Sequence, residues 1–329
     1  MELNLKNKAA VVSLAVSPDG KWLAIGQMVD EDLSAPLSIW NTDTWKCVAT
    51  VEKDQPFGIR SLSFNRHSNR LAYVPSGWHE VRFFNMNDLA TELEMGFQGA
   101  SQVRYAANKD LLIVVSEQVS VLDNEDVEIF IYRDYKAYEH TEGLSPELFK
   151  DYYRNSEWMV EASYGNLPAV ATFCKDDSAV IITGNNDNKF SVYDIESGKL
   201  IEQYPGGVIQ AQQIEIDSQE KHLFLISRMP YADLLWELPS MKRLLPQYLN
   251  EDYQGSSCFA FHPSGKYFAI GGAGGKVAFR DLDTGKFLMM EDIHEDEVNA
   301  LQFSKDGKLL ISGSDDGKVF ITDISEYLT

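Results

Sequence analysis

Two groups of acids are the side chains whose types and spacing could do chemistry. One group is Asp30, Glu31 and Asp32, and the other comprises Glu291, Asp292, Glu295, Asp296 and Glu297. Carboxylate oxygens are the ligands that hard cations prefer, so either group could hold a metal ion. Acids in loops also simply face water, and we favour that interpretation. We therefore predict no metal site.

Enzyme signatures are missing elsewhere in the sequence. It contains no His-Glu-x-x-His, no phosphate-loop lysine and no Gly-x-Ser-x-Gly, and its six histidines have no ligand spacing. The glycine-rich run Gly271–Gly275 follows one apolar run, but Lys276–Phe279 continues as another strand instead of a phosphate-binding helix. We interpret it as a hairpin turn and predict no catalytic residue and no cofactor.

Composition indicates a soluble chain with a large core. Its 329 residues are 44% hydrophobic and carry a formal net charge of -21. Three widely spaced cysteines favour a reducing compartment over a disulfide scaffold. No signal peptide and no stretch near the ~20 apolar residues of a membrane span is visible, so we expect a cytoplasmic protein without membrane contact. The acidic balance disfavours nucleic acid and favours a protein partner with a basic surface.

A repeat organises the whole chain. Each unit has one apolar residue just before a turn and another apolar residue seven positions later. The first set is Val16, Phe64, Tyr105, Phe173, Ile216, Phe261 and Phe303, and the second set is Leu23, Leu71, Leu112, Val180, Leu223, Phe268 and Leu310. The units are 48, 41, 68, 43, 45 and 42 residues apart. A period in the low forties with short strands is typical of a β-propeller blade.

Turn and strand-end residues agree with that period. The clearest turns are Ser17-Pro18-Asp19-Gly20-Lys21, His262-Pro263-Ser264-Gly265-Lys266 and Ser304-Lys305-Asp306-Gly307-Lys308. Third strands end in Trp40-Asn41, Phe84-Asn85, Tyr193-Asp194, Trp236-Glu237, Arg280-Asp281 and Thr322-Asp323. On these residues the sequence resembles the WD-repeat (WD40) family along essentially its whole length. The resemblance implies an all-β, seven-bladed propeller of four-stranded antiparallel blades, forming a single domain over residues 1–329.

The resemblance also implies a role for one histidine. In that family a His, a Ser or Thr, an Asp in a tight turn and a Trp form a buried hydrogen-bond network. His294, Ser312 and Asp316 match the first three positions, whereas Thr322 stands where Trp is expected. We therefore expect a partial network in which His294 is structural.

Two irregular regions need separate predictions. The seventh unit lacks a convincing fourth strand, and the alternating segment Glu2–Lys6 is predicted to supply it and to close the ring. In the third unit the third strand could end at Asp123 or at Asp134. We prefer Val119–Asp123 as the third strand and Val127–Tyr132 as the fourth.

The long step after the third unit indicates an insertion at about residues 136–166, between the third and fourth blades. Ser145 and Pro146 are typical of a helix start, and apolar residues follow at mostly helical spacing, so a helix is predicted from about Pro146 to Ala162. Family topology places this insertion, and the lengthened loop Met28–Pro36, on one face of the propeller.

Candidate partner-binding residues lie on loops of that face, because rigid scaffolds present functional loops and large aromatics and Arg anchor interfaces. They are Asp30, Glu31, Asp32, Phe57, Trp78, His79, Phe149, Tyr153, Trp158, Arg228 and Tyr231. The aromatic side of the inserted helix could instead pack on the propeller. Together these features favour a non-enzymatic interaction scaffold within a larger complex, monomeric by itself. The alternative is an enzyme or cation-binding propeller with its site at the channel mouth.

Overall fold

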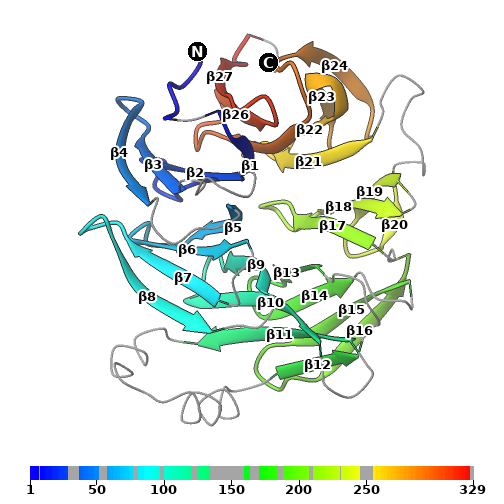
Figure 1. The fold of residues 1–329 in the computed structure, drawn as a ribbon. Coiled ribbons are helices and arrows are strands. Elements are labelled where there is room, and N and C mark those ends of the chain that lie inside the picture. The colour runs from blue at the N-terminus through cyan, green and yellow to red at the C-terminus, as the bar shows by residue number, and fades with distance from the viewer. Residues whose placement is uncertain are drawn as a thin grey trace.

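Seven antiparallel sheets follow one another along the chain in the computed structural model (Figure 1). It describes residues 1–6, 8–28, 37–51, 58–76, 80–96, 100–119, 125–133, 159–163, 170–183, 188–206, 210–229, 231–244 and 255–326. Six sheets have four strands each, and the last has three. The structure is therefore all-β, with one short 3-10 turn, η2 (Ala273–Gly275), in the part described.

The first four sheets cover the N-terminal two-thirds of the chain. Sheet one contains β1 (Ala10–Val16), β2 (Trp22–Met28), β3 (Leu37–Asn41) and β4 (Lys46–Val51). Sheet two contains β5 (Ile59–Phe64), β6 (Arg70–Pro75), β7 (Glu80–Asn85) and β8 (Ala90–Gly96). Sheet three contains β9 (Ala100–Tyr105), β10 (Leu111–Val119), β11 (Glu125–Arg133) and β12 (Met159–Ser163). Sheet four contains β13 (Val170–Cys174), β14 (Ala179–Thr183), β15 (Lys189–Asp194) and β16 (Leu200–Pro205).

The last three sheets complete the arrangement. Sheet five contains β17 (Gln210–Ile216), β18 (His222–Met229), β19 (Tyr231–Glu237) and β20 (Lys242–Arg243). Sheet six contains β21 (Ser256–Phe261), β22 (Tyr267–Gly272), β23 (Lys276–Asp281) and β24 (Phe287–Asp292). Sheet seven contains β25 (Val298–Phe303), β26 (Leu309–Ser314) and β27 (Val319–Asp323). The run Gly271–Gly275 ends β22 and forms the turn to β23 through Ala273–Gly275, as the hairpin interpretation predicted.

The repeat positions read from the sequence are cross-strand pairs in every sheet. The pairs are Val16 with Leu23, Phe64 with Leu71, Tyr105 with Leu112, Phe173 with Val180, Ile216 with Leu223, Phe261 with Phe268, and Phe303 with Leu310. The two strands of each pair are joined by a tight turn. In the first turn Gly20 has φ +82°, and the Asp19 carboxylate accepts a hydrogen bond from Lys21 N at 3.0 Å. Asp and Gly are therefore needed there for backbone reasons.

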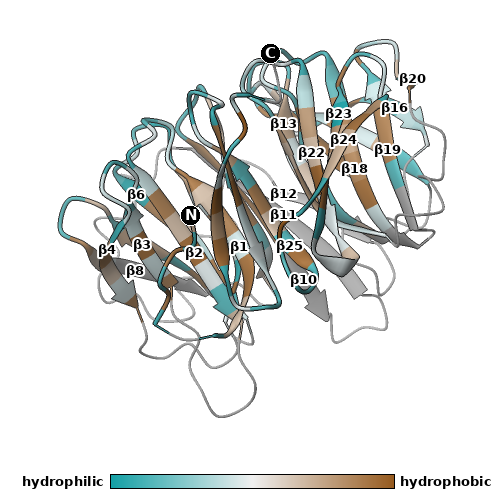
Figure 2. Ribbon diagram, turned by 90° about the horizontal axis from the view of Figure 1, so that it is seen from above, coloured by the Kyte–Doolittle hydropathy of each residue, from teal (hydrophilic) through white to brown (hydrophobic). Residues whose placement is uncertain are grey.

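The apolar side chains lie between neighbouring sheets. Strand centres are hydrophobic and connecting turns are hydrophilic, which Figure 2 shows as brown and teal segments. One cluster joins Leu14 and Ile25 of sheet one to Ile311 and Val319 of sheet seven. The first and last sheets therefore share a core, and β1 contacts both β25 and β26.

The turns between first and second strands form a belt of hydrogen bonds from sheet to sheet. Neighbouring turns are joined by six links, which are Asp19 N to Ser68 Oγ, Arg66 to Asp110, Asn108 N to Asp177 Oδ2, Asp176 N to Glu220 Oε1, Gln219 Nε2 to Ser264 O, and His262 Nε2 to Gly307 O. The Lys305 side chain lies against Gly20 at the remaining junction. Each sheet is thus tied to the next at the same level.

A second belt of hydrogen bonds joins the first strands of neighbouring sheets. Side chains of one strand bond the backbone of the next, as in Ser13 to Ile59 O, Ser61 to Val103 O, Gln102 to Ala171 O, Gln213 to Phe259 O and Asn299 to Val11 O. The last of these links joins β25 to β1. These polar residues stand on otherwise apolar strands because they satisfy backbone groups that no further strand can pair.

The N-terminal segment lies along β27. Glu2 forms an antiparallel bridge with Phe320, Met1 N donates to Ile321 O at 2.8 Å, and Leu3 N donates to Val319 O at 2.9 Å. Leu3 is only 4% exposed and joins the core shared by sheets one and seven. The N-terminus lies near this strand in Figure 1.

Two predictions for the third sheet are wrong. β11, not Val119–Asp123, is the third strand, since Leu112 pairs with Tyr132 in a nine-residue hairpin. The fourth strand is β12, so Met159–Ala162 is extended and not the end of a helix. The remainder of the predicted helix lies outside the described residues. Segment 134–158 thus connects β11 to β12, within one sheet and not between two.

The correction changes the face on which the insertion begins. Arg133, the last residue of β11, pairs with Leu111, beside the turn between first and second strands. Met28, the last residue of β2, pairs with Ala10 at the start of β1, which is the sheet edge opposite the turn between first and second strands. The connections that follow β11 and β2 therefore begin at opposite faces. No helix in the described part of the chain is long and apolar enough to cross a bilayer.

Candidate interaction site between the sixth and seventh sheets

One register position distinguishes the last two sheets from the others. It is the third-strand residue paired with the second apolar residue of each repeat. It is occupied by Trp40, Phe84, Tyr132, Tyr193, Trp236, Arg280 and Thr322 in chain order. The first five sheets thus place an aromatic residue there, the sixth an arginine and the seventh a threonine.

Four of these aromatic side chains pack on the preceding sheet, namely Trp40, Phe84, Tyr193 and Trp236. Trp236 contacts Phe190 of sheet four edge to face, with ring centroids 4.9 Å apart. Trp40 lies in the cluster that contains Ile311 and Val319 of sheet seven. Large rings at this point fill the space between two sheets, and burial of each contributes about 1.5–3 kcal/mol. A threonine cannot fill the same space.

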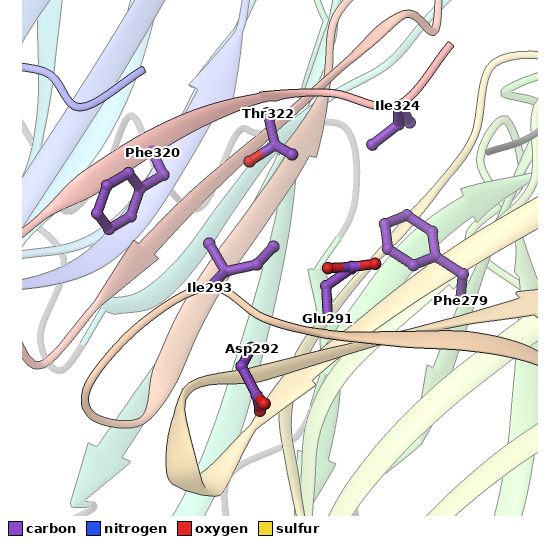
Figure 3. Close-up of a pocket in the computed structure, with 7 residues that line it drawn as sticks. All are labelled: Phe279, Glu291, Asp292, Ile293, Phe320, Thr322 and Ile324. Atoms are coloured by element: carbon purple, nitrogen blue, oxygen red, sulfur yellow. The ribbon is translucent and has the colours of Figure 1, made fainter. Parts of the chain in front are cut away.

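A pocket of about 230 Å³ lies where the side chain of Thr322 is too small (Figure 3). Its lining residues come from sheet six, sheet seven and the segment between them, and they are Phe279, Glu291, Asp292, Ile293, Phe320, Thr322 and Ile324. Phe279 and Ile324 are buried, at 1% and 2% exposed, and Asp292 is exposed. The pocket therefore has an apolar floor and a carboxylate rim.

The expected partial network borders this pocket. His294 Nδ1 lies 2.9 Å from Asp316 Oδ2, and His294 Nε2 lies 2.8 Å from Ser312 Oγ. Burial lowers the pKa of His294 below its ordinary 6.5, although Asp316 partly opposes this effect. The imidazole is therefore neutral at pH 7, and both ring nitrogens are used in holding one loop to β26. The ring of Phe320 packs edge-on against His294, with centroids 4.9 Å apart, between the network and the pocket.

Acidic side chains continue from the pocket along the segment before β25. Glu295 and Asp296 are exposed, and Glu297 is half-buried and bonded to Ser257. Burial raises the pKa of Asp315, and the nearby charges of Glu297, Asp296 and Asp316 raise it further. Several acidic side chains thus lie close together at this edge, and a cation bound there would reduce the repulsion between their charges.

The sixth sheet fills the same register position with a charge. Arg280 is 9% exposed, and its Nη1 donates to Gly285 O at 2.8 Å. Its charge acts on Asp233, a 4% exposed acid of β19 that accepts a hydrogen bond from Ser256 of β21. Burial raises the pKa of Asp233 to about 6, although the Ser256 hydrogen bond and the Arg280 charge lower it. A guanidinium can thus occupy the aromatic position when an acid lies on the preceding sheet.

The first strands carry the polar residues relevant to the alternative of a channel site. Arg104 Nη2 donates to Glu215 Oε1 at 2.9 Å, from β9 to β17. The two charges compensate each other. Among the residues that the structure describes, no three His, Cys, Asp or Glu side chains are grouped as metal ligands would be.

Most residues proposed from the sequence as partner contacts fall outside the described residues. These are Asp30, Glu31, Asp32, Phe57, Trp78, His79, Phe149, Tyr153 and Trp158. Arg228 and Tyr231 were placed in the loop of the fifth unit, and they lie on β18 and β19, where their backbones pair at the hairpin end. Their binding role, like that of the other nine, stays a prediction. The pocket itself was not predicted, although Thr322 had been recognised as a departure from the repeat.

Comparisons with known proteins agree with this architecture. The family model described as "WD domain, G-beta repeat" matches residues 285–323, which include β24 to β27. The guanine nucleotide-binding protein subunit beta of Zea mays is 23% identical over 163 residues, which cover 46% of this chain and 43% of that protein. The Retinoblastoma-binding protein 5 homolog of Drosophila melanogaster is 24% identical over 156 residues, covering 45% and 31%. The chain thus matches less than half the length of these relatives.

Among solved structures, the β-propeller domain of Cps50 (Swd1) from Myceliophteria thermophila superposes with a TM-score of 0.69. The match covers 99% of both chains at 13% sequence identity. At that identity the similarity shows the fold alone. The repeat match, the WD-repeat relatives and the shared propeller fold together support the similarity of this chain to the WD-repeat family of β-propellers.

Proposed function

We propose that this protein is a non-enzymatic scaffold that binds protein partners with a basic surface. The observation that carries the proposal is the junction between sheets six and seven. There an apolar pocket opens beside Glu291 and Asp292, and the acidic segment Glu295–Glu297 continues from it. The net charge of -21 gives the same preference to the surface as a whole.

In this proposal the seven sheets are the blades of one closed ring. The two belts of inter-sheet hydrogen bonds and the shared core of sheets one and seven support closure. Residues 1–6 complete the seventh blade, in keeping with the bonds that Met1 and Leu3 make to β27. A rigid ring of this kind holds its surface loops in fixed positions for a partner.

The names of two relatives also support a role within a protein complex. One relative is a subunit of a guanine nucleotide-binding protein, and another, from Arabidopsis thaliana, is THO complex subunit 3. The latter is 25% identical over 150 residues, which cover 46% of each chain. For this chain, membership of a complex is part of the proposal.

Affinity purification with an acid-to-amide variant tests the proposal. The variant replaces Asp292, Glu295 and Asp296 by their amides, and its matched control replaces Asp43, Asp88 and Asp283, exposed acids in the turns between third and fourth strands of sheets one, two and six. We expect the wild type and the control to retain the same partner in 0.1 M salt and the variant to lose most of it, since exposed charges interact over about 10 Å at that ionic strength. A wild-type protein that retains no partner would overturn the scaffold proposal. Equal retention by all three proteins would overturn the role of the acidic edge.

A further inference from the structure

We propose that the pocket at Thr322 binds an arginine side chain of the partner. This inference rests on the proposed scaffold function and names the chemical group that one of its sites recognises. It is argued from the shape of the pocket, from an uncompensated carboxylate and from an arginine that occupies the equivalent place in the neighbouring sheet.

The shape of the pocket suits a long side chain with a flat end. Its volume is about 230 Å³, and the rings of Phe279 and Phe320 lie toward its two ends (Figure 3). Ile293 lies between them, on the segment that links β24 to β25. Arginine has an aliphatic stem that packs on such a surface and a planar guanidinium that stacks on aromatic rings.

The charge of the pocket suits a cation. Glu291 is half-buried, and within the described part of the chain its carboxylate has no hydrogen-bond or ion-pair partner. Figure 3 shows this carboxylate beside the ring of Phe279, within the lining. A half-buried carboxylate without a cation leaves hydrogen-bonding capacity unused, and a guanidinium can satisfy both of its oxygens at once. Asp292 adds a second negative charge at the exposed rim.

The neighbouring sheet six has a guanidinium at the position equivalent to Thr322. Arg280 holds the third-strand position of sheet six that Thr322 holds in sheet seven, since they pair with Phe268 and Leu310 respectively. Arg280 is buried, and its positive charge acts on Asp233, a buried acid of sheet five. At Thr322 the acid of the preceding sheet is present as Glu291, but the arginine is missing. A partner's arginine would complete the same arrangement from outside.

The surroundings leave room for the peptide that carries this arginine. Phe287 and Leu288 on β24 are 51% and 43% exposed, so apolar surface continues away from Glu291 along the same strand. β24 is the last strand of its sheet and has one unpaired edge. We expect the contact to be made by an extended segment with a single inserted arginine.

The test uses the whole protein with labelled isoleucine methyl groups, because Ile293 and Ile324 both line the pocket. The probe is the blocked tripeptide Ac-Ala-Arg-Ala-NH₂, and its comparison is Ac-Ala-Nle-Ala-NH₂, in which norleucine keeps an aliphatic chain without the charge. We expect saturable shifts at these two methyls with the arginine peptide, in the millimolar range, and at least tenfold weaker binding of the norleucine peptide. Equal binding of both peptides, or no saturable shift with arginine, would overturn the inference.

Two variants locate the binding. Glu291→Gln removes the charge and should weaken binding of the arginine peptide at least tenfold, whereas Asp283→Asn, an exposed acid of the same sheet, should leave it unchanged. Thr322→Trp fills the pocket as Trp40 and Trp236 fill theirs, and it should abolish binding while raising Tm. Retained affinity in Glu291→Gln would contradict the site whatever the folding of the tryptophan variant. Because these titrations need no native partner, they can fail while affinity purification still succeeds.

Discussion

Arg104 and Glu215 form an ion pair of 2.9 Å that joins the third sheet to the fifth. Both residues stand next to the last position of a first strand, on β9 and β17, and sheet four lies between them in chain order. Their side chains are 27% and 22% exposed, so the pair is only partly open to solvent. The first strands therefore approach closely enough for one pair of side chains to bridge them.

A double-mutant cycle should detect this bridge. Arg104→Met, Glu215→Gln and the double variant are expected to show a coupling of about 1 kcal/mol in urea unfolding, the upper end for partly exposed pairs. The pair Asp306 and Lys308, 3.8 Å apart with side chains 58% and 68% exposed, provides the control and should couple near zero. If the Arg104 cycle gave no more coupling than the control, the contact would not hold the sheets together.

Gly307 should tolerate alanine poorly for two reasons. Its φ is +74°, and an added Cβ would lie 2.5 Å from Nε2 of His262, which bonds Gly307 O across the junction of sheets six and seven. Gly274 has the same φ but nothing within 4 Å of its Cβ position, so Gly274→Ala reports the backbone strain alone, about 1–2 kcal/mol. We expect Gly307→Ala to destabilise the protein by at least 1 kcal/mol more than that in urea unfolding, as overpacking does. Equal losses in the two variants would mean that His262 moves aside freely.

The sequence predicted the pairing of strands correctly where every unit has the same turn and the same flanking apolar residues. All seven first-to-second strand pairs follow from apolar residues seven positions apart, because a tight turn of fixed length sets the register of a hairpin. The His294 network was also predictable, since its three members lie within one unit. The hydrogen bonds between turns were not predictable, because each joins residues 44 to 69 positions apart with no shared motif.

The third sheet shows why local patterns can mislead. Both Asp123 and Asp134 follow runs rich in apolar residues, so spacing alone allows two third strands. The long hairpin of β10 and β11 is selected by nine cross-strand pairs, which only the folded chain reveals. Helical spacing around Met159 was overridden in the same way, because β11 offers an edge on which Met159–Ser163 can pair. The pocket was not predicted for a related reason. It arises because Thr322 is smaller than the aromatic residues or the arginine that other sheets have at the same position.

Leu3 should be needed for stability although it lies in a segment with one isolated bridge. Its side chain is 4% exposed among Val11, Trp40 and Val319, so Leu3→Ala should cost about 2–5 kcal/mol by leaving a cavity in the core shared by sheets one and seven. Glu2→Ala is the matched control, because Glu2 uses its backbone for the bridge to Phe320 and its side chain is exposed. Urea unfolding of both variants measures the difference. A Leu3→Ala protein as stable as the control would show that residues 1–6 do not complete the seventh sheet.

His294 should make the protein less stable in mild acid. Burial lowers its pKa below 6.5, with Asp316 partly opposing, so the unfolded chain binds a proton at a higher pH than the folded chain does. The contribution of neutral His294 is therefore complete above about pH 6.5 and is lost as the pH falls through the lower folded pKa. Unfolding free energies measured from pH 8 to pH 5 should fall more steeply in the wild type than in His294→Gln.

Comparing the wild type with His294→Gln separates the titration of His294 from that of other buried acids. Burial would raise the pKa of Asp316, but hydrogen bonds from Glu295 N, Lys318 N and His294 lower it below 3.8, so Asp316 stays ionised throughout this range. Burial raises the pKa of Asp233 to about 6, so its protonation in acid favours the folded state, and it does so equally in both proteins. The glutamine side chain can still accept one hydrogen bond and donate another between β26 and its loop, but it takes up no proton. Parallel pH profiles for the two proteins would mean that His294 is not held neutral by the fold.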